Sequence, residues 1–254
     1  MTRSHSDLLA ADHDLDGIPR DTVPERSVVI CTTPGARGDL VAAALRRYGA
    51  GVPMEYFDID DVAAPLTRRW GVIDLDDYIA ALHHHRTAAT GVFGLVLQWR
   101  HVRRLHRRVS GITQLTAGRV LGIVNALAPS PAFVFVRDAE PDRQAVHLHA
   151  AHAGDDVYDQ RAIAERLALL DATQRCWLEF FDHTDSDVLE VTVDDGFATD
   201  PPVERFAAAL DLRLQPDAGE TGPHPAAAAP IEHRMVQRFR ADRARQDRAD
   251  DLLV

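Results

Sequence analysis

The stretch that decides the fold covers residues 28–48 and reads VVICTTPGARGDLVAAALRRY. Its apolar run at residues 28–31 is typical of a strand buried on both faces, and its apolar residues at 40–48 recur with the period of a helix. A tight Gly/Pro loop at residues 33–38 joins the two. Loop N–H groups and a helix N-terminus attract anions, so this arrangement can cradle a phosphate. A plain strand-to-helix turn is the competing interpretation.

Similar patterns continue along the chain. Further apolar strands are predicted at residues 92–99 and 133–136, and an alternating strand at residues 188–193. Residues 53–70 are predicted to be irregular. Helices are predicted at residues 74–86, 100–108, 116–127, 141–153, 159–181, 202–210 and from about 231. Alternating strands and helices indicate an α/β fold, a single domain with a central parallel sheet covered by helices. Ligands bind at the carboxyl ends of such strands, which makes residues 33–39 and Arg137 the first candidates.

Composition and charge limit the possible functions. The chain has 254 residues and a formal net charge of -11, which disfavours nucleic acid and anionic membranes as partners. All 28 basic residues are arginine, which excludes lysine-dependent chemistry. The two cysteines, Cys31 and Cys176, form no disulfide framework. The sequence has neither a membrane-length apolar run nor a signal-peptide pattern, so we expect a cytoplasmic protein.

The chain divides into four predicted regions. Residues 1–26 are polar and acidic and are expected to be a flexible arm. Residues 27–214 form the α/β domain, residues 215–230 a Pro/Ala-rich linker, and residues 231–254 a charged C-terminal helix.

Several segments, in the same order, resemble the trehalose sulfotransferase family of mycobacteria and their relatives. Residues 31–35 (CTTPG) are similar to the strand and phosphosulfate loop of sulfotransferases. Residues 51–57 (GVPMEYF) resemble the family's G-x-P-x-E-[FY]-F segment, and residues 91–99 (GVFGLVLQW) resemble its G-V-[FW]-G-x-K-L-x-W strand. Residues 133–137 and 144–146 resemble the strand and helix that hold the 3′-phosphate of PAPS, and residues 162–164, 177–181 and 232–240 resemble later helices.

This resemblance implies a P-loop-like fold of the PAPS-sulfotransferase type. It also implies transfer of a sulfuryl group from PAPS to a hydroxyl of a sugar or specialised metabolite. Glu55 matches the glutamate that acts as general base on the acceptor hydroxyl. His147 stands at a family serine and is a candidate acid/base or phosphate donor. The implied cofactor contacts are Thr33, Pro34, Gly35, Ala36, Arg37, Gly38, Asp39 and, on the 3′-phosphate, Arg137.

The loop departs from the family pattern T-P-R-S-G-[ST]-T. Gly35 replaces the arginine, and Ala36, Gly38 and Asp39 replace the hydroxyl residues. We expect Asp39 to cap the helix and repel a phosphosulfate, and Arg37 to neutralise Asp39 or reach an anion. Each lost charge-assisted contact removes roughly 1.5–3 kcal/mol, so we predict weak or undetectable binding of PAP and PAPS.

The residues therefore leave three functions open. The first is a divergent sulfotransferase. The second is the same fold used for PAPS-independent chemistry in a natural-product pathway, and the third is a non-catalytic binding or regulatory partner. No metal is expected.

Structural roles compete with the functional ones at each site. Glu55 can be a local structural carboxylate, and Arg137 can pair with Asp138 or another acid. The three histidines at residues 83–85 are expected on a solvated helix face, and five arginines within residues 100–108 form a solvated face or a contact for an acidic partner.

Because members of the resembled family are commonly dimers, we predict a homodimer.

Overall fold

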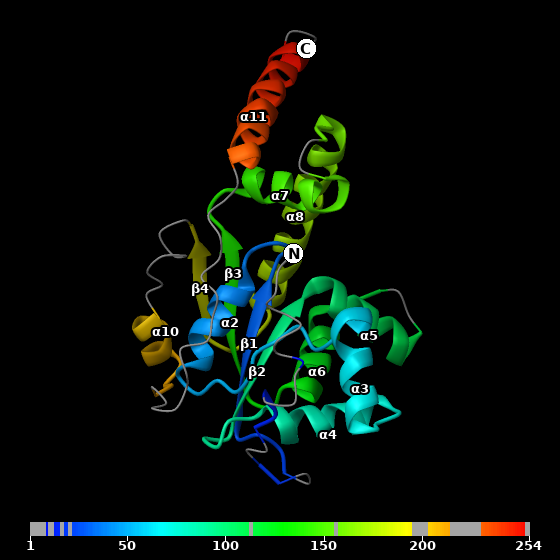
Figure 1. The fold of residues 1–254 in the computed structure, drawn as a ribbon, viewed down its shortest axis with the longest axis vertical. Coiled ribbons are helices and arrows are strands. Elements are labelled where there is room, and N and C mark those ends of the chain that lie inside the picture. The colour runs from blue at the N-terminus through cyan, green and yellow to red at the C-terminus, as the bar shows by residue number, and fades with distance from the viewer. Residues whose placement is uncertain are drawn as a thin grey trace.

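A central sheet of four parallel strands organises the molecule (Figure 1). The computed structural model describes residues 9, 13–15, 18–19, 22–111, 114–154, 157–194, 203–213 and 230–251. The strands are β1 (Arg26–Thr32), β2 (Val92–Gln98), β3 (Pro131–Asp138) and β4 (Val188–Val193), in the order β2-β1-β3-β4. All pairings are parallel, which confirms the α/β class and its central parallel sheet.

Helices connect the strands and cover both faces of the sheet, as parallel pairing requires. In chain order, they are α2 (Gly38–Arg46), the π-helix η2 (Ile59–Ala63), α3 (Ala64–Trp70), α4 (Leu75–Arg86), α5 (Trp99–Ser110), α6 (Ala117–Leu127), α7 (Pro141–Ala153), α8 (Gln160–Phe181), α10 (Val203–Ala209) and α11 (Pro230–Asp251). No described helix is both long enough and apolar enough to cross a membrane.

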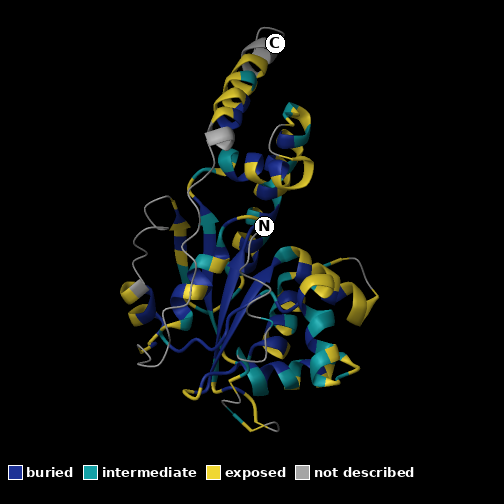
Figure 2. Cartoon of the chain, in the orientation of Figure 1, coloured by how far each residue is buried: buried dark blue, intermediate teal, exposed yellow. Residues whose placement is uncertain are grey.

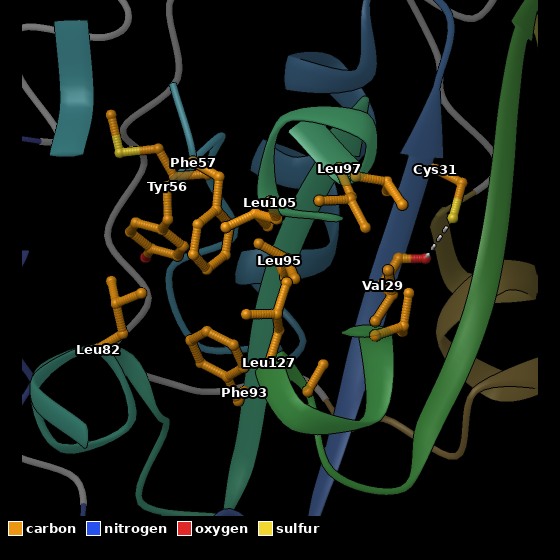
Figure 3. Packing of buried hydrophobic residues seen from close by; sticks show 14 of the residues in the cluster. Val29, Cys31, Tyr56, Phe57, Leu82, Phe93, Leu95, Leu97, Leu105 and Leu127 are labelled. Carbon is orange, nitrogen blue, oxygen red and sulfur yellow. Dashed lines mark hydrogen bonds between the residues drawn. The ribbon is translucent and has the colours of Figure 1, made fainter. Parts of the chain in front are cut away.

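Alternating strand residues divide the core into two layers. Val29 and Cys31 of β1 face one side with residues of β2, β3, α3 to α6 and α8, and Figure 3 shows part of this layer around Phe93 and Leu95. Val28 and Ile30 face the other side, where α2 and α10 cover the sheet. Strands buried on both faces read as continuous apolar runs, and this explains why the sequence pattern located them (Figure 2).

The prediction that residues 53–70 are irregular is wrong for the second half of this range. Residues 59–70 form η2 and α3. Val62 and Leu66 are one helical turn apart, and both are buried in the first core layer. Pro65 lies in the first turn of α3, where its missing N–H breaks no intrahelical bond. The apolar pair and the early proline were the signals of this helix.

The histidine run at residues 83–85 is not the solvated face that was expected. His83 is buried edge-on against Phe93, and its Nε2 lies 2.9 Å from the carbonyl oxygen of Leu127. Burial lowers the pKa of His83, so it is neutral in the folded protein. His85 stacks on Trp70 with ring centroids 4.9 Å apart.

A third apolar cluster joins α7, α8 and the C-terminal helix. Val146 of α7, Ile163 of α8 and Phe239 of α11 are buried together in it. Arg240 adds ion pairs to Glu140 and Asp142 at 2.9 and 3.1 Å. The helix predicted from about residue 231 is therefore present and packs on α7, whereas most of the predicted linker lies outside the described residues.

Candidate functional site

The strand order places a topological switch point between β1 and β3. The chain leaves β1 for β2 on one side of it and later returns to β3 on the other side. Ligands of open parallel sheets bind in the crevice at such a point, at the carboxyl ends of the strands. The loop at residues 33–37 follows β1 at this edge, and Arg137 and Asp138 end β3 there. The structure thus brings the predicted cofactor residues to one edge of the sheet.

Helix α7 packs directly onto the loop. The buried Gln144 donates from Nε2 to Thr33 Oγ1 at 2.9 Å and to the carbonyl oxygen of Pro34 at 2.6 Å. A Cβ atom on Gly35, whose φ is +73°, would lie 3.1 Å from Cδ2 of Leu148. Ala36 is buried in the core. These contacts fill the α7 side of the loop with the protein's own groups.

The start of α2 differs from the prediction for Asp39. The N-cap residue is Arg37, with a left-handed φ of 53°, and no side chain caps the helix. Asp39 is exposed in the first turn. The helix begins at Gly38, where a Cβ would lie 2.4 Å from Cγ2 of Thr32, so the close approach of α2 to β1 requires glycine. Asp39 is therefore not the helix cap, although its charge still lies at the positive end of the helix dipole.

Arg37 lies beside the end of β3 and the residue that follows β4. Its Nη2 donates to the carbonyl oxygen of Asp194 at 3.1 Å, and its Nε lies 4.0 Å from Asp138 Oδ2. Asp138 is buried and also accepts from Arg143 at 3.1 Å and from the backbone N–H of Glu140 at 2.8 Å. A buried carboxylate thus holds the arginine charges at the carboxyl end of β3, where a phosphate contact was expected.

Arg137 has an acidic partner on the neighbouring strand. Its Nη2 lies 3.5 Å from Oε2 of Glu190 in β4, and both side chains are about half exposed. This is the structural role that was left open for Arg137, a sheet-end arginine paired with an acid.

Glu55 lies at the same edge, above the end of β2. The backbone around it is held beside the strand because Val96 donates its N–H to the carbonyl oxygen of Met54 at 2.9 Å. Oε1 of Glu55 accepts from Nε2 of Gln98 at 2.6 Å. Gln98 is paired in register with Thr32, the last residue of β1. Glu55 is therefore positioned next to the strand that leads into the loop.

Three further side chains surround the Glu55 carboxylate. Nη2 of Arg100 lies 3.4 Å from Glu55 Oε2 and 3.0 Å from Asp58 Oδ2. The buried His101 lies 3.8 Å from Glu55 Oε2 through its Nε2. Arg100 therefore bridges the two carboxylates.

His101 is held by the start of α5. Its Nδ1 accepts from the backbone N–H of Gln98 at 3.3 Å in a capping box. Burial first, and then the nearby Arg100, lower the pKa of His101 to about 4, so the ring is neutral at pH 7. A neutral ring has one acceptor nitrogen, and Arg100 Nε also lies 3.2 Å from Nε2. We assign the proton to Nε2 because the backbone donor is fixed, whereas the Arg100 side chain is 58% exposed.

Glu55, Asp58 and His101 have the ligand types of a metal site, with ligand atoms within 4.8 Å of one another. Two features favour a guanidinium instead. Arg100 already supplies the positive charge that these two carboxylates face. Metal binding through Nε2 would also move the ring proton to Nδ1, against the N–H of Gln98.

The other predicted catalytic residue lies on a different element. His147 is exposed on α7, which follows β3, two strand positions from β2 in the sheet. Sequence reasoning missed Asp58, Gln98 and His101 as site residues. It gave Asp138 only as a partner for Arg137, and Gln144 only as part of the helix that resembles the 3′-phosphate site. A polar residue that ends a buried strand, as Gln98 and Asp138 do, was the available signal.

Comparison with known proteins adds no further assignment. No protein-family model matches the chain, and no curated protein matches it. The resemblance carried by the sequence motifs therefore stays a prediction.

Proposed function

We propose that this chain is a sulfotransferase-like protein that binds a hydroxyl-bearing small molecule at Glu55 and does so without PAPS. The proposed ligand is a sugar or specialised metabolite. The observation that carries the proposal is the Gln144 amide, which bonds to both Thr33 and Pro34 in the loop that would hold the phosphosulfate.

The donor half of the site argues against a bound phosphosulfate. The α7 side of the loop is filled by Gln144 and Leu148. Arg37, the remaining cation of the loop, faces the buried carboxylate of Asp138. The exposed Asp39 adds a negative charge to the helix start that an anion would approach.

The acceptor half has the chemistry to bind hydroxyl groups. Gln98 donates to Oε1 of the Glu55 carboxylate, and Arg100 and His101 lie beside its Oε2. The Glu55 side chain is 19% exposed, so a ligand can reach it. A hydroxyl can donate to this carboxylate and accept from the more exposed Arg100. Two such contacts fix the orientation of a polyol.

Sulfuryl transfer from PAPS is the second candidate. One observation favours sulfuryl transfer. Glu55 contacts the end of β2, and the loop follows the adjacent end of β1. The acceptor and donor halves of one site would have to be neighbours in this way. Sulfuryl transfer also requires Arg37 to turn from Asp138 toward the donor. The donor test below therefore separates the two candidates.

The donor test is calorimetric titration of the purified protein with PAP and with PAPS. We expect no heat of binding at ligand concentrations up to about 1 mM, which corresponds to less than about 4 kcal/mol of binding free energy. The same titration of Gln144→Ala shows whether the amide is what closes the loop. A dissociation constant below about 1 μM for the unaltered protein would refute the proposal and restore the sulfotransferase function.

The acceptor test is a thermal-shift screen of sugars, polyols and hydroxylated metabolites. A true ligand raises the Tm of the unaltered protein and fails to raise that of Glu55→Gln. Glu179→Gln is the matched control, since Glu179 is exposed on α8, away from β2. A ligand that stabilises Glu55→Gln equally would remove Glu55 from the site. Binding without turnover in donor and acceptor panels would favour a non-catalytic binding protein.

A further inference from the structure

A second group of charged residues lies at the opposite end of β2 from Glu55. It is built around Arg86, the last residue of α4. The carbonyl oxygen of Arg86 accepts from the N–H of Val52, and the next residue, Thr87, forms a bridge with Phe93 near the start of β2. Gln98, which holds Glu55, ends the same strand. The two groups are therefore separate sites.

The centre of this group is the carboxylate of Asp14. Oδ1 of Asp14 lies 2.5 Å from Nη2 of Arg69 and 3.0 Å from Nη2 of Arg86. Oδ2 accepts from the indole Nε1 of Trp70 at 3.1 Å. Two guanidinium groups and one neutral N–H therefore converge on one carboxylate, which comes from a segment distant in sequence.

The surroundings hold the two arginines in place for an anion. The side chain of Arg86 is fully buried, and that of Arg69 is 25% exposed. Their guanidinium carbons lie 5.7 and 5.3 Å from the centroid of the Trp70 ring. Trp70 also stacks on His85. A buried arginine is rare without a charge partner, and two neighbouring guanidinium groups repel each other, so this geometry requires an anion.

The same helices also contact the backbone around Asp14. Arg69 donates to the carbonyl oxygen of Leu9, and Arg86 Nη1 donates to that of His13 at 3.1 Å. Nδ1 of His84 lies 2.6 Å from the carbonyl oxygen of Ile18, and the N–H of Leu15 donates to the carbonyl of His85 at 2.8 Å. These four hydrogen bonds are made to backbone groups of the segment rather than to its side chains, as in the recognition of an extended peptide.

We propose that Arg69, Trp70 and Arg86 form a carboxylate-binding site, and that the chain fills this site with its own Asp14. Asp14 and the residues on either side of it are then an internal ligand, held by the Asp14 carboxylate, by a contact between His13 Nδ1 and Arg46 Nη2 at 2.9 Å, and by several backbone contacts. The residues predicted to be a flexible arm include this ligand. A small free carboxylate binds in the same place when the Asp14 side chain is removed.

The test is chemical rescue of full-length Asp14→Ala with formate, which matches the missing carboxyl group. In chloride buffer we expect the Tm of the variant to fall by roughly 5–15 °C, because the buried Arg86 loses the carboxylate of Asp14 that it faces. In formate at equal ionic strength we expect at least a third of that loss to be recovered, with a saturable dependence on formate concentration. The Tm of the unaltered protein should change by less than about 1 °C.

Asp76→Ala is the matched control, since Asp76 is an exposed carboxylate in the first turn of α4, the helix that carries Arg86. Its Tm should not respond to formate. If Asp14→Ala does not fold in chloride, the yield of folded protein after dialysis into formate replaces the Tm as the readout. An equal response of the variant, the control and the unaltered protein, or no recovery of Asp14→Ala, would overturn the carboxylate site.

Discussion

Acid should destabilise this protein through His101. The imidazole is buried beneath Glu55 and Arg100, and its pKa is lowered to about 4 from the usual value of 6.5. The charged groups that act on it are Arg100 and Arg104, which disfavour the protonated ring, and Asp58, which favours it. Burial dominates these charges, so the folded protein keeps the ring neutral.

The size and direction of the effect follow from proton linkage. Between pH 6.5 and about 4, the unfolded chain binds a proton at His101 that the folded chain does not bind. The stability contributed by the neutral ring is therefore fully present above pH 6.5 and is lost as the pH falls toward 4. The difference between the two pKa values corresponds to about 3 kcal/mol in total, lost at about 1.4 kcal/mol for each pH unit within that window.

The assay is urea unfolding at several pH values from 7.5 to 4.5, on the unaltered protein and on His101→Gln. Glutamine has no charge to gain and can still accept from the N–H of Gln98. At pH 7.5 the variant should have the lower free energy of unfolding. As the pH falls to 4.5, the difference between the two proteins should shrink by about 2–3 kcal/mol, because only the unaltered protein loses stability through His101. Groups distant from residue 101 are common to both proteins and cancel in the difference. A difference constant within about 0.5 kcal/mol would show that His101 is not a buried neutral ring.

Three further predictions concern the two halves of the site and the assembly. Glu55→Gln should lower the free energy of unfolding by only about 1–2 kcal/mol in urea titrations, because the neutral side chain can still accept the hydrogen bond from Gln98. A larger loss would mark Glu55 as structural. Gly35→Arg should lower the free energy of unfolding by about 1–3 kcal/mol, because φ of residue 35 is positive and Leu148 is in contact. Asp39→Thr, at an exposed position, should change the free energy of unfolding by less than about 0.5 kcal/mol. Equal effects of the two substitutions would show that α7 does not constrain the loop. Light scattering should give a mass twice the 28.0 kDa of the chain if the predicted homodimer forms, and a mass near 28.0 kDa would contradict it.

The sequence was sufficient for the sheet because β1, β2 and the middle of β3 are buried on both faces and are short apolar runs between turn signals. The edge strand β4 alternates instead, and β4 and α7 begin and end at the residues that the pattern indicated. The helix at α3 was missed because a short helix with one buried residue gives a weak periodic signal. Local sequence therefore predicted the layers of the fold better than the short connecting helices.

The site was less predictable because its contacts join distant parts of the chain. The motif around Glu55 located the carboxylate at the correct edge, and the end of β2 located Gln98 nearby. By contrast, the bonds from Gln144 to the loop cross more than 100 residues, and the contacts of Asp14 cross more than 50. No local pattern encodes such pairs. The arginine-rich stretch shows the same limit, since Arg103 and Arg104 are exposed, as expected, whereas Arg100 turns toward Glu55.

The departures of the loop from the sulfotransferase pattern form one coupled change rather than several independent losses. An arginine side chain at residue 35 would start from a left-handed backbone and meet Leu148, so the glycine and the packing of α7 depend on each other. Gln144 also ties α7 to the loop through Thr33 and Pro34, and the Arg37 charge already faces the carboxylate of Asp138. Restoring single loop residues should therefore not restore donor binding. Recovery of PAP binding would require that α7 also give up its contacts at Gln144 and Leu148.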